Sequence, residues 1–245
     1  MAGHSKWANI RHRKERMDSK RGRVFARLIK EATVAARIGG ADPSHNPRLR
    51  LAVEKARAAN VPNDNLERAI KRGGGQLEGA EYAEIRYEGY GPGGAAVLVD
   101  CLTDNKNRAL SDVRHVFNKH GGNLGAGGSV AYLFSRCGQL WYAPAAFSAA
   151  AADIAIENGA SDLHSGEDGS MEVVCAAEEF SALCDALRAA GYAPDAADIV
   201  MRPSSETALG EIDSARMRKL LNALEDLDDT QEVHTAAVLC GEELS

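Results

Sequence analysis

The sequence has little of what secreted, membrane-spanning or zinc-binding proteins show. Aromatic residues make up 5% of the 245 residues, and no run approaches the roughly 20 apolar residues of a membrane helix. The five cysteines are widely spaced and never form C-x-x-C; they are Cys101, Cys137, Cys175, Cys184 and Cys240. This spacing favours buried thiols in a reducing compartment over a disulfide framework or a zinc site. We therefore expect a cytoplasmic protein with no membrane partner and no metal.

Targeting and catalytic motifs are also missing. The N-terminus is basic but lacks the apolar core of a secretory signal, and Trp7, His4 and the nearby acids disfavour a mitochondrial presequence. The histidines form no ligand set, and no G-x-S-x-G is present. The acids at positions 225–229 could hold a cation but are more typical of a solvated helix end. The sequence therefore predicts a protein that is not an enzyme and has no cofactor.

Gly89–Gly94 formally matches the dinucleotide pattern G-x-G-x-x-G. That pattern binds pyrophosphate only between a strand and a helix N-terminus. Here the apolar strand Ala95–Leu102 follows, and Pro92 removes one amide. A β-hairpin connection is favoured, with a nucleotide-dependent enzyme as the alternative that a nucleotide-induced rise in melting temperature would reveal. The second glycine-rich segment, GGNLGAGG, is expected to be a loop that leads into a strand at Ser129–Phe134.

Acidic residues are scarce at the N-terminus, where the first thirty residues contain ten Lys or Arg and two acids. Through Gly75 there are 18 basic and 7 acidic residues, a formal charge of +11, whereas the remainder has 11 and 28, or −17. A polyanion would be attracted to the N-terminal part. Basic side chains neutralise phosphates, and aromatic rings stack on bases. The predicted nucleic-acid-binding residues are His4, Lys6, Trp7, Arg11, His12, Arg13, Lys14, Arg16, Lys20, Arg21, Arg23, Arg27 and Lys30.

Hydrophobic spacing predicts helices in the first 78 residues, after an arm of little periodicity at 1–17. The predicted helices are Ser19–Gly39, a second from Pro47 to just before Val61 with Asn46 as its N-cap, and a short third from Asn63 or Asp64. Glycines or a proline end each of them. These elements make a three-helix domain with a basic arm.

Strand patterns begin after residue 78. One β unit is expected to contain strands Tyr82–Glu88 and Ala95–Leu102, a helix from Asp104 or Asn105 to about His120, and later a helix Asp213–Leu227 and a strand Glu232–Leu239. Between its two parts the order is strand, helix, strand, strand, helix, strand, the ferredoxin-like arrangement. We predict an α+β fold of three domains: a helical domain at 1–78, a central α/β domain at 79–136 plus 204–245, and an inserted ferredoxin-like α/β domain at 137–203.

Five segments closely resemble a known protein family. They are MAGHSKWANIRHRK, RGRVFARLIKE, GGADPSHNPRLRLAVEKARAANVPNDNLERAIKRG, YEGYGPGGAAVLVDCLTDNKNR and GGNLGAGGSVAYLF. These runs resemble the YebC/PmpR family, densely over residues 1–136 and more loosely to about 235. The resemblance implies a three-domain α+β fold without enzyme activity or cofactor. The matching binding positions are the arm from His4 to Lys14 and the basic residues of the first helix.

The resemblance implies two functions. Members are described as transcriptional regulators that bind promoter DNA, and some act in translation at the ribosome on proline-rich stretches. The first hypothesis is a DNA-binding regulator acting through the basic N-terminal domain, although no clean helix-turn-helix is evident. The alternative is a ribosome-associated factor whose arm contacts rRNA, with Trp7 stacked on a base. The acidic domains are expected to contact protein partners. The family commonly has Tyr and Asn where this chain has His234 and Ala236.

Overall fold

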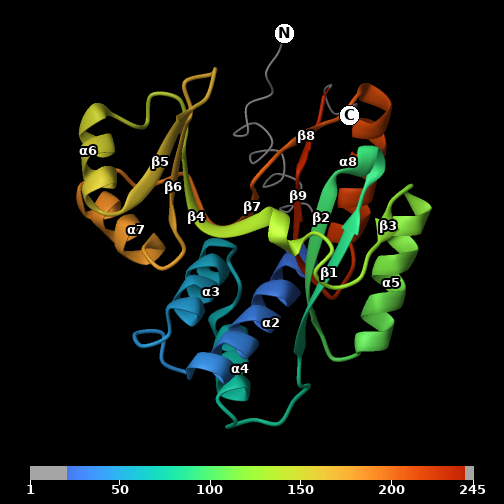
Figure 1. Cartoon of the computed structure of the whole chain (residues 1–245). Helices are drawn as coiled ribbons and strands as arrows, with labels where there is room; N and C mark the ends of the chain where they lie inside the picture. Colours follow the sequence, from blue (N-terminus) through green and yellow to red (C-terminus); the bar gives the residue numbers. More distant parts are fainter. Residues whose placement is uncertain (1–20, 241–245) are drawn as a thin grey trace. The chain divides into compact units, whose positions relative to one another are not determined.

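The computed structural model describes residues 21–240, which fall into two compact units (Figure 1). The larger unit contains residues 21–132 and 206–240, and the smaller contains residues 133–205. Within the described residues, seven α-helices combine with two four-stranded antiparallel sheets, which confirms the predicted α+β class. The division of the larger unit into a helical and a β domain stays a prediction. The predicted arm, residues 1–17, lies outside the described residues.

Three helices open the larger unit: α2 (Arg21–Gly39), α3 (Pro47–Ala58) and α4 (Asn63–Gly73). Asn46 is the N-cap of α3 as predicted, because its side chain accepts a hydrogen bond of 3.0 Å from the Leu49 amide. The core between the helices is made mostly of alanine; it contains Ala32, Ala35, Ala36, Leu49, Ala52, Val53, Ala56, Val61, Leu66 and Ala69. Such small side chains allow the helices to approach closely.

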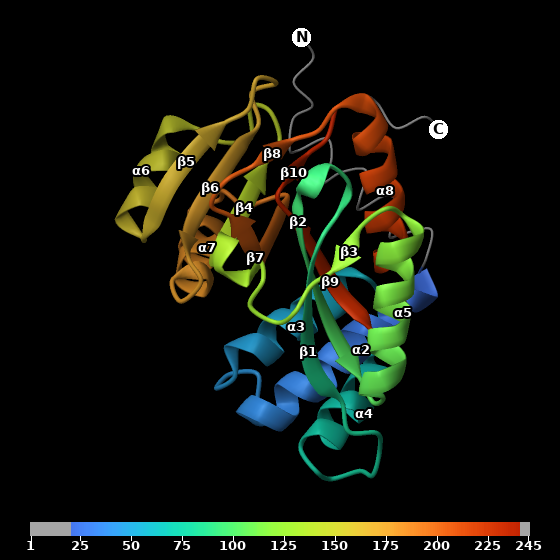
Figure 2. The ribbon, with the colours of Figure 1, turned by 45° about the vertical axis from the view of Figure 1, so that its right-hand side comes forward.

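The larger unit also contains an antiparallel sheet in the order β3-β1-β2-β9. Its strands are β1 (Ala83–Tyr90), β2 (Ala96–Thr103), β3 (Asn123–Leu124) and β9 (Thr230–Thr235). Two helices, α5 (Lys106–Lys119) and α8 (Glu211–Glu225), pack on the face that carries Val97 and Val99 (Figure 2). As predicted, the last helix and strand complete the unit that β1, β2 and α5 begin.

Two strand predictions need correction. Ser129–Phe134 is not a strand: residues 131–133 form the 3-10 turn η2 (Ala131–Leu133), and β4 begins at Phe134. The amides of Gly128, Val130 and Ala131 donate to the buried carboxylate of Glu88 instead of a neighbouring strand. The expected strand Glu232–Leu239 is divided into β9 and β10 (Ala237–Val238), and β10 pairs with β8 (Thr207–Ala208) in parallel.

The smaller unit has the predicted order of strands and helices. Its elements are β4 (Phe134–Tyr142), α6 (Ala149–Glu157), β5 (Ala160–Ser165), β6 (Met171–Ala176), α7 (Phe180–Ala189) and β7 (Ala196–Pro203). The strand order is β5-β6-β4-β7 with every neighbouring pair antiparallel. This is the split βαβ topology expected from the sequence. The buried Tyr142 donates a hydrogen bond of 3.0 Å to the Tyr192 carbonyl and so satisfies its hydroxyl.

Candidate nucleic-acid interface

The predicted binding residues are only partly within the described residues. His4, Lys6, Trp7, Arg11, His12, Arg13, Lys14, Arg16 and Lys20 lie outside them. Arg21 is the first residue of α2, and only its backbone is described. Arg23, Arg27 and Lys30 lie on α2 at intervals of four and three residues, so they share one side of the helix. The structure therefore brings these three predicted residues together.

Their partners are at the end of α8 and in the turn that follows it. Arg23 forms an ion pair of 3.2 Å with Asp226, and Arg27 donates to the Glu225 carbonyl. Helix α8 has no basic residue in its last turn. The cations of α2 therefore neutralise the negative end of the α8 dipole and satisfy a terminal carbonyl. Part of the predicted phosphate-binding charge stabilises the fold of the larger unit.

Asp229 is the centre of this contact, and its side chain is only 7% exposed. Lys30 lies 3.0 Å from Asp229 Oδ1, and Arg108 and Thr103 donate to Asp229 Oδ2 over 2.8 and 2.9 Å. Burial acts to raise the pKa of Asp229, but the hydrogen bonds from Arg108, Lys30 and Thr103 lower it below its ordinary value. The expectation of a solvated helix end at 225–229 is wrong for two of the acids, because Asp226 pairs with α2 and the buried Asp229 pairs with α2 and α5, whereas Asp228 is exposed.

A cavity of about 520 Å³ lies beside this network. Arg23, Lys30 and Arg108 line it together with five carboxylates, those of Asp104, Asp112, Asp226, Asp228 and Asp229. Tyr82 adds an aromatic ring, and the Lys30 ammonium lies 5.5 Å from its centroid. Because carboxylates outnumber cations here, the cavity does not suit a phosphate. No group of three potential metal ligands occurs among the described residues.

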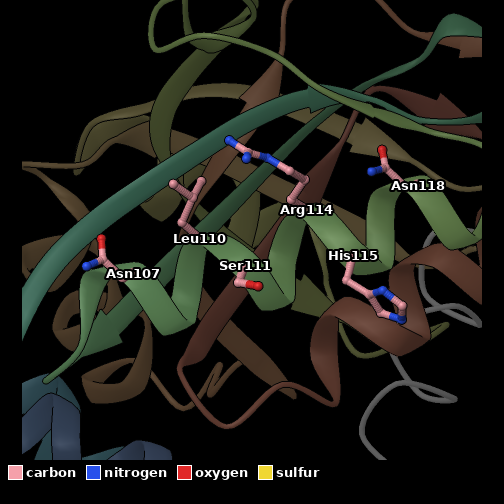
Figure 3. Close-up of a pocket in the computed structure, with 6 residues that line it drawn as sticks. All are labelled: Asn107, Leu110, Ser111, Arg114, His115 and Asn118. Atoms are coloured by element: carbon pink, nitrogen blue, oxygen red, sulfur yellow. The ribbon is translucent and has the colours of Figure 1, made fainter.

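The outer face of α5 has a different charge. A shallow groove of about 330 Å³ is lined by Asn107, Leu110, Ser111, Arg114, His115 and Asn118 (Figure 3). All six come from α5, and none is acidic. None of these residues is among those predicted from the sequence, although residues 106–120 contain four Lys or Arg and only one acid within the acidic part of the chain. That local charge pattern could have identified them.

Neither glycine-rich segment is a phosphate cradle. As predicted, Gly89–Gly94 belongs to a β-hairpin: its first two residues end β1, and Gly91–Gly94 lies in the connection to β2. The amides of Gly91 and Gly94 already donate to Ala95 and Gly91 carbonyls. At the end of the second segment and directly after it, the amides of Gly128, Val130 and Ala131 bind Glu88. These donors are therefore not available to a nucleotide.

The cysteines lie where the sequence predicts, whereas the surroundings of one histidine, His234, were not predicted. All five cysteines are free thiols and four are buried, as expected. Burial raises the pKa of Cys101 to about 12, so its thiolate is scarce at neutral pH. His234 is isolated in sequence, but its side chain is 8% exposed and lies 3.3 Å from Glu232 and 3.7 Å from Asp100. Strand pairing between β2 and β9 creates this cluster.

The fold defines a class of α+β protein in which a βαββαβ unit lies, along the chain, between two parts of a second sheet. No helix among residues 21–240 is long and apolar enough to cross a membrane. Two family models match the chain, the TACO1/YebC N-terminal domain over residues 5–76 and the TACO1/YebC second and third domain over residues 82–237. The chain therefore belongs to the TACO1/YebC family.

Individual relatives agree with this assignment over nearly the whole chain. A probable transcriptional regulatory protein of Aromatoleum aromaticum is 58% identical over 98% of this chain and 99% of its own. One from Laribacter hongkongensis is 59% identical with the same coverage. The crystal structure of a conserved hypothetical protein, Aq1575 of Aquifex aeolicus, matches with a TM-score of 0.83 and 45% identity, covering 93% of this chain and 94% of that one.

Proposed function

We propose that this protein is a DNA-binding transcriptional regulator that acts through its basic N-terminal part and catalyses no reaction. The observation that carries the proposal is the separation of charge, +11 through Gly75 and −17 in the remainder. Such a distribution attracts DNA to one part of the chain and repels it from the rest. The relatives are named probable transcriptional regulatory proteins, which supports a regulatory role.

We assign the main phosphate contacts to the residues before α2. Arg23, Arg27 and Lys30 have partners at positions 225–229, which neutralise part of their charge. The six Lys and Arg residues among positions 1–20 face only two acids in that segment. The assigned phosphate-binding residues are Lys6, Arg11, Arg13, Lys14, Arg16 and Lys20, with His4 and His12 as further donors and Trp7 as a stacking ring.

The test is binding of promoter DNA by the full chain and by a variant without residues 1–16. We expect the deletion to abolish most affinity in fluorescence anisotropy and to leave the melting temperature unchanged. For the full chain, log K should fall by about 0.9 per phosphate contacted for each tenfold rise in salt. A length-matched variant with Arg11, Arg13, Lys14 and Arg16 changed to Gln controls for lost chain length. An unchanged dissociation constant in both variants would contradict the proposal.

Crosslinking in growing cells, followed by sequencing of bound DNA and RNA, tests the nature of the target. Enrichment of discrete promoter sequences is the expected result. Enrichment of particular rRNA positions with little DNA would instead indicate the ribosome-associated translation factor. The transcriptional effects of the protein would then be indirect.

A further inference from the structure

The outer face of α5 carries a row of polar side chains at helical spacing. Asn107, Ser111, Arg114 and Asn118 follow one another at intervals of three or four residues and line the groove shown in Figure 3. All four side chains are exposed, and none makes a hydrogen bond or ion pair with another side chain of residues 21–240. The row thus presents unused donors and acceptors to solvent.

The opposite face of the helix holds this row in place. Val113, Val116 and Phe117 are buried against the sheet and α8. Asn105 caps the start of α5, because its side chain accepts a hydrogen bond of 3.1 Å from the Arg108 amide. A helix fixed by its cap and by a packed core presents its outer side chains at defined positions, as recognition of a rigid partner requires.

Positive charge gathers beside the same row. Arg114 lies within it, and the exposed Lys119 and Lys219 lie near His120 at its C-terminal end. Burial lowers the pKa of His120, and the nearby charges of Lys119, Lys219 and His115 lower it further. Cations often stabilise the C-terminus of a helix, which accounts for Lys119 but not for Arg114. In a part of the chain with a net charge of −17, this cluster points to an anionic partner.

We propose that the outer face of α5 enters the major groove of duplex DNA and reads base edges there. Asn107 and Asn118 are eleven residues apart, about 16 Å along a helix, which matches roughly five base pairs. A major groove about 12 Å wide admits one helix. Asparagine pairs with adenine and arginine with guanine by two hydrogen bonds each. Lys119 and Lys219 would contact the flanking phosphates and fix the register.

This inference rests on the proposed function and adds to it the element that reads sequence. Basic N-terminal residues supply affinity for any DNA, whereas base edges must be contacted by side chains such as those of α5. The sequence shows no helix-turn-helix, so a single helix packed on a sheet takes this role. The two contributions can be separated, because one determines general affinity and the other determines sequence preference.

The experiment is selection from a pool of randomised duplex DNA by the full chain, followed by anisotropy with the selected and a scrambled duplex. Arg114→Ala and Asn118→Ala should each lower affinity for the selected duplex by about tenfold or more and leave the scrambled duplex unaffected. Lys119→Gln should weaken both equally and reduce the salt slope by about one. Arg188→Ala removes an exposed arginine from α7 of the smaller unit and should change neither affinity.

The outcomes test the reading role of α5 separately from the binding role of the N-terminal residues. If Arg114→Ala and Asn118→Ala are folded, as their melting temperatures will show, and select the same sequences as the parent, the reading role of α5 is wrong. Binding of single-stranded RNA but of no DNA sequence also overturns it. If the deletion of residues 1–16 has no effect while the α5 variants lose sequence preference, the inference stands and the N-terminal assignment fails.

Discussion

Lys30 and Asp229 form an ion pair of 3.0 Å across a separation of 199 positions in the chain. Both side chains are shielded, with 17% and 7% of their surface exposed. The Lys30 ammonium also donates to the Asp228 carbonyl over 3.0 Å. This pair joins the basic helix α2 to the turn between α8 and β9, so residues predicted to bind phosphate also stabilise the larger unit.

Asp229→Asn should lower the free energy of unfolding by about 2 kcal/mol, because Lys30 and Arg108 lose the negative charge of their buried partner. Urea denaturation measures the change. Asp226→Asn, whose side chain is 39% exposed beside Arg23, is the control and should cost under about 1 kcal/mol. Since the folded pKa of Asp229 is lowered, its contribution is present above the unfolded value and is lost as pH falls through the folded one. Equal effects of the two substitutions would contradict this role.

His234 should make stability depend on pH in the opposite direction. Burial acts to lower its pKa, but Asp100 and Glu232 raise it above the ordinary value of about 6.5. Its contribution is therefore complete below the unfolded pKa and is lost as pH rises through the folded pKa. The other charged groups here are Arg86, 2.7 Å from Asp100, and Lys55, 4.0 Å from Glu232.

Unfolding curves measured from below the unfolded pKa of His234, about 6.5, to above its folded pKa test the prediction. In the variant His234→Gln, the loss of stability with rising pH should be smaller than in the parent protein. His45→Gln, at a side chain 85% exposed, is the control and should keep the parent's pH dependence. If His234→Gln keeps the full pH dependence of the parent protein's stability, another group is responsible for it.

Glu88 should hold the segment 128–131 through its carboxylate. It accepts hydrogen bonds of 2.6, 2.8 and 2.7 Å from the amides of Gly128, Val130 and Ala131. Glu88→Gln places an amide group against these donors, so we expect a loss of about 1–3 kcal/mol and faster hydrogen exchange at the three amides. Glu78→Gln, at an exposed position, is the control. Unchanged exchange in the Glu88 variant would rule out this function of the carboxylate.

Gly73→Ala should destabilise the contact between α2 and α4. A Cβ at position 73 would collide with the Thr33 carbonyl oxygen and lie 2.7 Å from the Ala36 methyl. We expect a cost of about 1–3 kcal/mol from overpacking, which exceeds the gain in helix propensity of about 1 kcal/mol. Gly22→Ala, which meets no atom within 4 Å, should leave thermal stability unchanged or slightly raised. A Gly73 variant as stable as the parent would mean that the helices can separate without cost.

The sequence by itself determined the features that depend on neighbouring residues. Asn46 and Asn105 cap α3 and α5. Each side chain accepts a hydrogen bond from the amide three residues later, so local spacing was sufficient to predict both caps. The order of strands and helices in the smaller unit followed from apolar periodicity. The charge of the N-terminal segment is likewise a property of composition, and it carries the proposal of nucleic-acid binding.

The tertiary structure alone decided what distant residues do to one another. Ser129–Phe134 has the composition of a strand, but Glu88, some forty positions earlier, accepts hydrogen bonds from the amides of Gly128, Val130 and Ala131. The acids at 225–229 look solvated in sequence, yet α2 lies against them and buries Asp229. His234 lies near Glu232 on its own strand, but it acquires Asp100 as a second carboxylate neighbour only when β9 pairs with β2. Hydrogen bonds and charges act through space over a few ångströms, so their partners were fixed only when folding brought these segments together.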